Sequence, residues 1–106
     1  MSVIREDDLI ESIADALQYI SYYHPADFVE AMAAAWEREE NPGAKQAMAQ
    51  ILVNSRMSAV GRRPICQDTG AANVHVKIGV EAKTDFKQSV HDICDEGTSQ
   101  GYLRDT

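Results

Sequence analysis

Residues 73–80 alternate between branched apolar side chains and other residues, and this stretch restricts the possible folds more than any other. Its apolar members are Val74, Val76, Ile78 and Val80. Alternation with a period of two is typical of a strand with one buried face. A strand cannot remain unpaired in water, because its backbone groups need partners. The chain has no second stretch of this kind, so we expect pairing with a short piece around Ile65, with another chain, or with sequence beyond these 106 residues.

The rest of the chain has the periodicity of helices, with apolar residues recurring every three or four positions. The expected helices cover residues 8–22, 25–40, 41–61 and 84–97. Pro25 favours the start of the second helix, and Asn41 is the expected N-cap of the third. Thr84 is the expected N-cap of the last helix, and Gly97 is its expected C-terminal end. We therefore predict an α+β fold that is mainly α, with four helices and one clear strand or a small sheet.

Length and charge limit the possible partners. A chain of 106 residues is long enough for one small domain with a modest core. Its net charge of −7 at pH 7 argues against nucleic acid and anionic membranes as partners. No stretch approaches the ~20 apolar residues of a membrane helix, and the N-terminus lacks the pattern of a signal peptide. Two cysteines provide no disulfide framework. These features predict a soluble, cytoplasmic protein.

Residues 63–70 read RPICQDTG and place a thiol, an amide, a carboxylate and a hydroxyl at four consecutive positions. Pro64 and Gly70 favour a shaped loop over a helix. Consecutive side chains on a loop can converge on one small ligand, as a functional site requires. An ordinary polar connection with a structural cysteine would have the same composition, so the residues alone leave both interpretations open.

The RPICQDTG segment resembles a motif of the iron–sulfur (class I) fumarate hydratases. The similarity extends to Tyr23-His24-Pro25, to residues 51–57, to residues 74–80 and to Gly101-Tyr102-Leu103, and so covers nearly the whole chain. Members of that family are several times longer, and this chain stops before their remaining cluster cysteines and most of their catalytic residues. The resemblance therefore implies that residues 1–106 are a single N-terminal domain or fragment.

The resemblance implies a hydro-lyase that catalyses the reversible hydration of fumarate to L-malate, a step of the tricarboxylic acid cycle. Cys66 would be one of three cysteines that hold a 4Fe-4S cluster. Gln67 and Asp68 match positions that contact the dicarboxylate substrate, and Asp68 would perform acid–base work. A homodimer is implied at full length, with the remaining C-terminal part of the enzyme as a partner. One thiolate is only part of a ligand set, so we expect the isolated chain to hold no stable cluster and to be inactive.

Two other functions remain open. The first is the related tartrate dehydratase, which shares the iron–sulfur chemistry. Gln67 before Asp68 favours fumarate hydratase, because the resemblance associates the tartrate enzymes with a second acidic residue there. The second is a non-enzymatic helical module that binds a partner through the open edge of its strand.

The cysteines and histidines also allow other chemistry. Cys66, His75, His91 and Cys94 could bind zinc, although the chain has no closely spaced pair of cysteines. Cys66 could act as a nucleophile with His75 as its base. Cys94 by itself is typical of a small buried apolar residue.

Four further residues have more than one interpretation. His24, between two expected helices, is typical of a turn or cap residue, and a role as ligand or acid–base group stays open. Arg62 and Arg63 could attract a dianionic substrate or pair with surface carboxylates. Trp36 is expected to anchor the core from the second helix.

Overall fold

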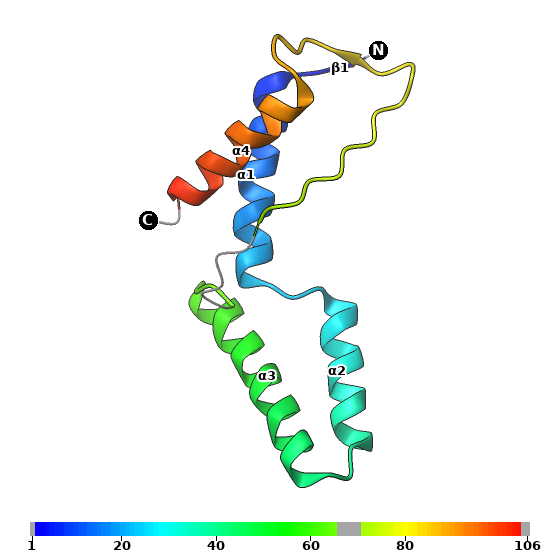
Figure 1. Ribbon diagram of the computed structural model, residues 1–106, viewed down its shortest axis with the longest axis vertical. Helices are drawn as coiled ribbons and strands as arrows, with labels where there is room; N and C mark the ends of the chain where they lie inside the picture. Colours follow the sequence, from blue (N-terminus) through cyan, green and yellow to red (C-terminus); the bar gives the residue numbers. More distant parts are fainter. Residues whose placement is uncertain (1, 66–70, 105–106) are drawn as a thin grey trace. The chain divides into compact units, whose positions relative to one another are not determined.

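The computed structural model describes residues 2–65 and 71–104, which form four helices and two short strands (Figure 1). Their bounds are β1 Val3–Ile4, α1 Glu6–Tyr22, α2 Ala26–Arg38, α3 Pro42–Gly61, β2 Lys83–Thr84 and α4 Val90–Arg104. The described chain divides into two compact units, which we call the hairpin unit (residues 20–65) and the terminal unit (residues 2–19 and 71–104). The prediction of a mainly α member of the α+β class with four helices is confirmed.

The strand predicted at residues 73–80 does not form within the described chain, where these residues pair with no strand (Figure 1). Pairing with another chain or with further sequence stays a prediction. The small sheet instead joins β1 and β2 in parallel, with Val3 opposite Lys83 and Ile4 opposite Thr84. An alternating pattern gives a strand only where another backbone is available to pair with it. Alternate residues of this segment still face the same side, since Ala72, Val74 and Val76 line a cavity of about 250 Å³ against α4.

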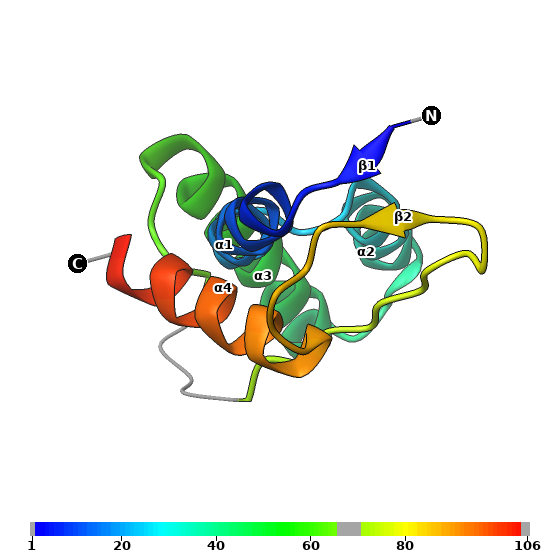
Figure 2. The same cartoon turned by 90° about the horizontal axis from the view of Figure 1, so that it is seen from above.

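Two glycines let α1 and α4 lie close together in the terminal unit (Figures 1 and 2). A Cβ atom added to Gly97 would stand 2.7 Å from the Cβ of Ile13, and one added to Gly101 would stand 3.0 Å from the carbonyl oxygen of Ala14. The buried apolar residues of the described chain are Ile10, Ala14 and Ile93. All three belong to these two helices, so the core of this unit lies where α1 and α4 cross.

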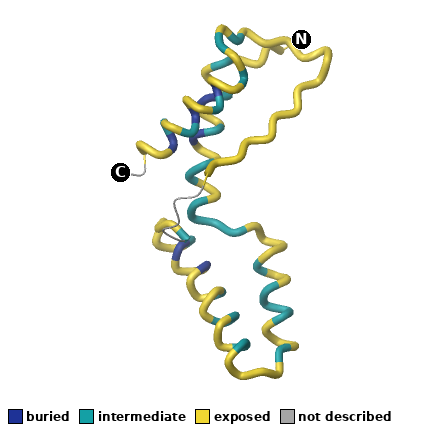
Figure 3. Tube along the Cα trace, viewed as in Figure 1, coloured by how far each residue is buried: buried dark blue, intermediate teal, exposed yellow. Residues whose placement is uncertain are grey.

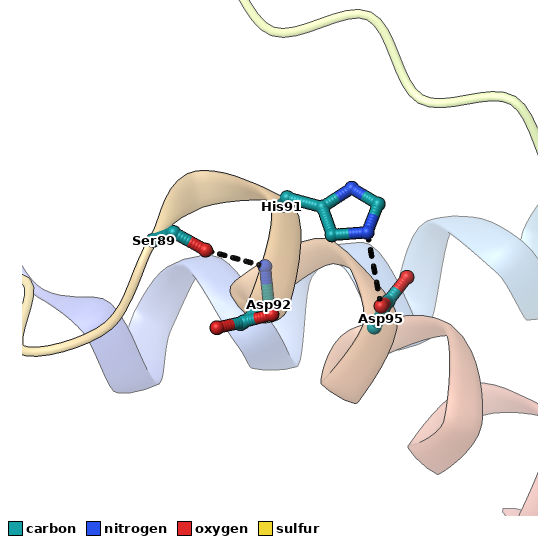
Figure 4. A network of polar contacts seen from close by, with 4 residues as sticks. All are labelled: Ser89, His91, Asp92 and Asp95. Atoms are coloured by element: carbon teal, nitrogen blue, oxygen red, sulfur yellow. Dashed lines mark hydrogen bonds and ion pairs between the residues drawn. The ribbon is translucent and has the colours of Figure 1, made fainter.

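The last helix begins later and ends later than the sequence predicts. Thr84 lies in β2, and α4 starts at Val90. Ser89 caps it, because its Oγ accepts a hydrogen bond from the N–H of Asp92 at 3.1 Å (Figure 4). Gly97 is buried inside α4, so the prediction that it ends the helix is wrong. Because Gly97 has no side chain, α4 can pack closely on α1 at this position, and the helix does not end there.

The connection from β2 to α4 is tied to the first turn of α1. The N–H of Glu6 donates to Asp85 Oδ1 at 2.7 Å, which satisfies one of the free donors at the start of α1. In return, Glu6 Oε1 accepts from the N–H groups of Lys87 at 2.8 Å and Gln88 at 3.1 Å. Each segment therefore supplies a carboxylate to the backbone of the other.

The hairpin unit consists of α2 and α3, which run antiparallel and are joined by a short turn (Figure 1). Asn41 Oδ1 accepts hydrogen bonds from the N–H of Gly43 at 2.9 Å and of Ala44 at 3.2 Å. Pro42 occupies the first turn of α3, where its missing N–H leaves no hydrogen bond unmade. The predicted start of the third helix at Asn41 is confirmed.

Large apolar side chains of the hairpin unit are exposed, and no described residue of α2 is buried (Figure 3). Trp36 is 36% exposed, and Lys45 Nζ lies 4.4 Å from the centroid of its ring, within range of a cation–π contact. The prediction that Trp36 anchors a core is therefore wrong for the chain as described. The other exposed members are Ile20, Phe28, Ile51, Val53, Met57 and Val60. None of the described helices combines the length and the apolarity needed to cross a membrane.

Candidate functional site

Cys66, Gln67 and Asp68, the three predicted site residues, lie outside the described residues. The structure places the frame that leads to them, which is the C-terminal end of α3 and residues 62–65. Every element of this frame belongs to the hairpin unit. Its geometry therefore describes the course of the chain up to Ile65.

A left-handed residue turns the chain at the end of α3. Arg62 has φ 52° and ψ 50°, and it is the one described residue other than glycine with a positive φ. The carbonyl oxygen of Ser58 accepts from the N–H of Arg62 and, at 3.1 Å, from the N–H of Arg63. The bond from Arg62 is that of an αL ending and the bond from Arg63 is the 6→1 bond of a Schellman ending; in both, the left-handed residue is usually glycine. The chain thus leaves α3 through a defined turn.

Ile65, the residue before Cys66, is held through both of its backbone polar groups. Its N–H donates to the carbonyl oxygen of Ser21 at 2.8 Å, near the end of α1. Its own carbonyl oxygen accepts from Asn54 Nδ2 of α3 at 3.0 Å. Ile65 therefore pairs with single groups of two helices and not with a strand, so the alternative that a piece around Ile65 pairs with residues 73–80 is also wrong.

His24 connects the start of α2 to α3. Its Nδ1 lies 2.9 Å from Ser55 Oγ, and its ring packs on Phe28 with centroids 4.7 Å apart. Ser55 is buried, with 8% of its surface exposed. The interpretation of His24 as a residue of the junction between two helices is confirmed. Its ring fixes the position of α3 relative to the α1–α2 turn.

Three stretches that carry the resemblance meet in the hairpin unit. Tyr23-His24-Pro25 reaches residues 51–57 through the bond between His24 and Ser55. Residues 51–57 reach the RPICQDTG segment through the bond between Asn54 and Ile65. The sequence analysis did not single out Asn54, although it lies within a resembling stretch. The adjacent polar residues Asn54, Ser55 and Arg56, in a helix that otherwise has many apolar side chains, are the signal that could have indicated it.

A concavity of about 520 Å³ lies beside this frame. It is lined by Asn54, Arg56, Met57, Ser58, Val60, Gly61, Arg63 and Pro64. No carboxylate of the described residues pairs with Arg56 or Arg63, so two guanidinium groups line it without a described counter-charge. In a chain of net charge −7, this is a local positive region next to the RPICQDTG segment.

The other candidate ligands do not assemble in the described chain. No three His, Cys, Asp or Glu side chains of the described residues are placed to share a metal ion. His91 Nε2 pairs with Asp95 Oδ2 at 3.4 Å on the exposed face of α4 (Figure 4). Cys94 is half-buried and lines the cavity between α4 and residues 72–76. With Cys66, the chain offers two thiols at most, which fits part of a cluster ligand set and not a whole one.

The structure thus anchors the backbone at Ile65, and a thiol, an amide and a carboxylate follow this residue in the sequence. The chain belongs to the fumarate hydratase (Fumerase) family, whose sequence profile matches residues 10–106. The resemblance inferred from the RPICQDTG segment is thereby confirmed.

One relative extends this finding to a second enzyme of the same superfamily. The chain is 28% identical over 67 residues to a putative L(+)-tartrate dehydratase subunit alpha of Methanocaldococcus jannaschii. The aligned stretch covers 63% of this chain and 24% of the relative, so the chain spans about a quarter of that protein. No solved structure matches the chain. The comparisons thus indicate a hydro-lyase family without separating fumarate from tartrate as substrate.

Proposed function

We propose that this chain is the part of an iron–sulfur hydro-lyase that supplies one cluster ligand and the first contacts to a dicarboxylate substrate. The observation that carries the proposal is the family match over residues 10–106, which includes the whole RPICQDTG segment. The anchored Ile65 supports it, because a ligand-bearing segment needs a fixed point of attachment.

Each residue of the segment has a separate task in this proposal. Cys66 provides a thiolate, the soft donor that iron–sulfur clusters require. Gln67 donates a hydrogen bond to a substrate carboxylate without adding charge. Asp68 holds or delivers a proton at the substrate hydroxyl. When bound, a 4Fe-4S cluster supplies an open iron that acts as a Lewis acid on that hydroxyl.

Fumarate is the substrate that we propose, with tartrate as the alternative. Both reactions add or remove water beside a carboxylate, so the same residues serve either one. Gln67 supports fumarate, whereas the name of the M. jannaschii relative supports tartrate. The ratio of kcat/KM for the two substrates decides between them.

The rest of the enzyme is the partner that we propose for the exposed apolar side chains of the hairpin unit. Met57 and Val60, at 66% and 78% exposure, are the most exposed large apolar residues of α3. Both line the concavity beside the RPICQDTG segment. The chain spans 24% of a relative that is itself named a subunit, which supports further polypeptide as the covering surface. On this proposal the isolated chain is inactive, and the complete enzyme is a homodimer.

The test uses the complete enzyme with single substitutions in the RPICQDTG segment. Cys66→Ser removes the soft donor, so bound iron and activity should both be lost. Asp68→Asn keeps the shape and removes the ionisable group, so iron should stay bound while turnover falls by roughly 10²–10⁴-fold. Gln67→Ala deletes a neutral contact worth on the order of 1 kcal/mol, so it should chiefly raise KM.

Iron content and melting temperature are measured together with the kinetics of each variant. If all three substitutions only lower the melting temperature, the segment is an ordinary connection and the chain is a non-enzymatic module. An Asp68→Asn enzyme with bound iron and normal turnover would remove Asp68 from the mechanism.

A further inference from the structure

We propose that Asn54 is a positioning residue that fixes the backbone at Ile65, the residue before the proposed cluster ligand Cys66, and so affects how firmly the complete enzyme holds iron. The proposal rests on the proposed role of Cys66 as a cluster ligand. It assigns to α3 a function that goes beyond packing on α2.

The geometry acts through the peptide group that Ile65 shares with Cys66. Asn54 Nδ2 holds the carbonyl oxygen of Ile65 at 3.0 Å. A peptide group is planar, so fixing its C=O also fixes the plane from which the next residue continues. On the other side, the N–H of Ile65 is held by the carbonyl oxygen of Ser21 at 2.8 Å. Both peptide planes that flank the Cα of Ile65 are therefore restrained.

The helix that carries Asn54 is itself held in place. The next residue of α3, Ser55, bonds to His24 at 2.9 Å, and Ser55 is buried. One turn later, the carbonyl oxygen of Ser58 holds the turn that leads to Pro64. Asn54 thus reaches Ile65 from a fixed base, and the intervening segment has a constrained φ at its proline.

An amide is the chemistry that this position requires. The carbonyl oxygen of Ile65 needs a donor, and Asn54 supplies one through Nδ2. Aspartate has the same shape but only acceptors when ionised, so Asn54→Asp removes the donor with little change in volume. The side chain of Asn54 is exposed, so its loss should disturb Ile65 far more than it disturbs the helices.

The first experiment measures amide hydrogen exchange by NMR on the 106-residue chain. Asn54→Asp and Asn54→Ala remove the bond to the carbonyl oxygen of Ile65. The Ile65 N–H should then leave the carbonyl oxygen of Ser21 more often and exchange up to about tenfold faster relative to the amides of α2. The control is Asn41→Ala, which removes the cap at the opposite end of the same helix. It should weaken α3 without changing the ratio between Ile65 and α2. The proposal would be overturned if the ratio of the exchange rate at Ile65 to that of the α2 amides were the same in the Asn54 and Asn41 variants.

The second experiment measures how long the complete enzyme retains iron in the presence of a chelator. Asn54→Asp should shorten retention by about tenfold, the same factor as the lost restraint on Ile65, whereas Asn41→Ala should leave it unchanged. Faster exchange at Ile65 with normal iron retention would overturn the link to Cys66. A wild-type enzyme that binds no iron would overturn the proposed function instead, and the exchange measurement would still decide whether Asn54 fixes Ile65.

Discussion

Arg62 is the residue at which the chain turns from α3 toward Ile65. A left-handed conformation crowds the Cβ atom of any residue other than glycine and costs roughly 1–2 kcal/mol. Arg62 adopts it with φ 52°, directly after Gly61. Two hydrogen bonds to the carbonyl oxygen of Ser58 hold it there. The turn therefore stores strain next to the proposed site.

We expect Arg62→Gly to raise the free energy of unfolding by about 0.5–1 kcal/mol, because glycine adopts a positive φ without the Cβ contact. Glycine also gives the unfolded chain more freedom, which limits the gain. The measurement is the midpoint of urea unfolding. Arg56→Gly is the matched control, since it places the same change inside α3, where it should cost about 1 kcal/mol. Two losses of equal size would show that the turn at Arg62 carries no strain.

Some residues of the candidate site could be found from sequence patterns, and others could not. The RPICQDTG segment could be singled out as a candidate because the adjacency of thiol, amide and carboxylate is a local property. The residues alone left an ordinary connection open, and the family resemblance favoured a site. Asn54 was not singled out, since its partner Ile65 is eleven positions away and the bond depends on the turn at Arg62. A contact that forms when the chain reverses direction has no characteristic spacing in the sequence, so periodicity does not indicate it.

The same holds for the ends of helices and strands. An end set by local contacts was predicted correctly, and features that depend on distant contacts were not. Asn41 was correctly placed as a cap because its bonds to Gly43 and Ala44 are made within three residues. Residues 73–80 form no strand within the described chain, because strand formation requires a partner that alternation does not supply. Gly97 was wrongly assigned to a helix end, because glycine stops helices in isolation but also permits close packing.

The contact between α1 and α4 gives a prediction for that glycine. A Cβ on Gly97 would meet Ile13 at 2.7 Å, too close for side chain or helix to remain in place. Gly97→Ala should therefore destabilise the terminal unit by about 1–3 kcal/mol, despite the better helix propensity of alanine. Thermal unfolding by circular dichroism measures the change. Gly79→Ala serves as control, because nothing lies within 4 Å of its added Cβ, and it should leave stability nearly unchanged.

At the scale of the whole molecule, charge sets how a dianionic substrate approaches. The chain carries a net charge of −7, so an anion is repelled except where cations gather. Arg56 and Arg63 line the concavity beside the RPICQDTG segment. Replacing both with glutamine in the complete enzyme should lower kcat/KM by about two- to tenfold at low salt, with a smaller effect at high salt.

Arg38→Gln is the control for this double substitution, since Arg38 ends α2 and does not line the concavity. It removes a positive charge from the same unit. An equal loss of kcat/KM from Arg38→Gln and from the double variant, after allowance for the number of charges, would assign the effect to net charge and not to the concavity.

The contacts between the two ends of the terminal unit have a consequence for synthesis. Glu6 and Asp85 are 79 positions apart, and Asp15 and Arg104, which form an ion pair, are 89 positions apart. The helical hairpin of α2 and α3 lies between these positions. Its two helices are close in sequence, so it can fold as soon as it leaves the ribosome. At about 5–20 residues per second, α1 waits roughly 4–18 s for the last helix to arrive. During that interval Ile10 and Ala14 have no α4 to cover them, so we expect α1 to be a segment of the nascent chain that chaperones bind.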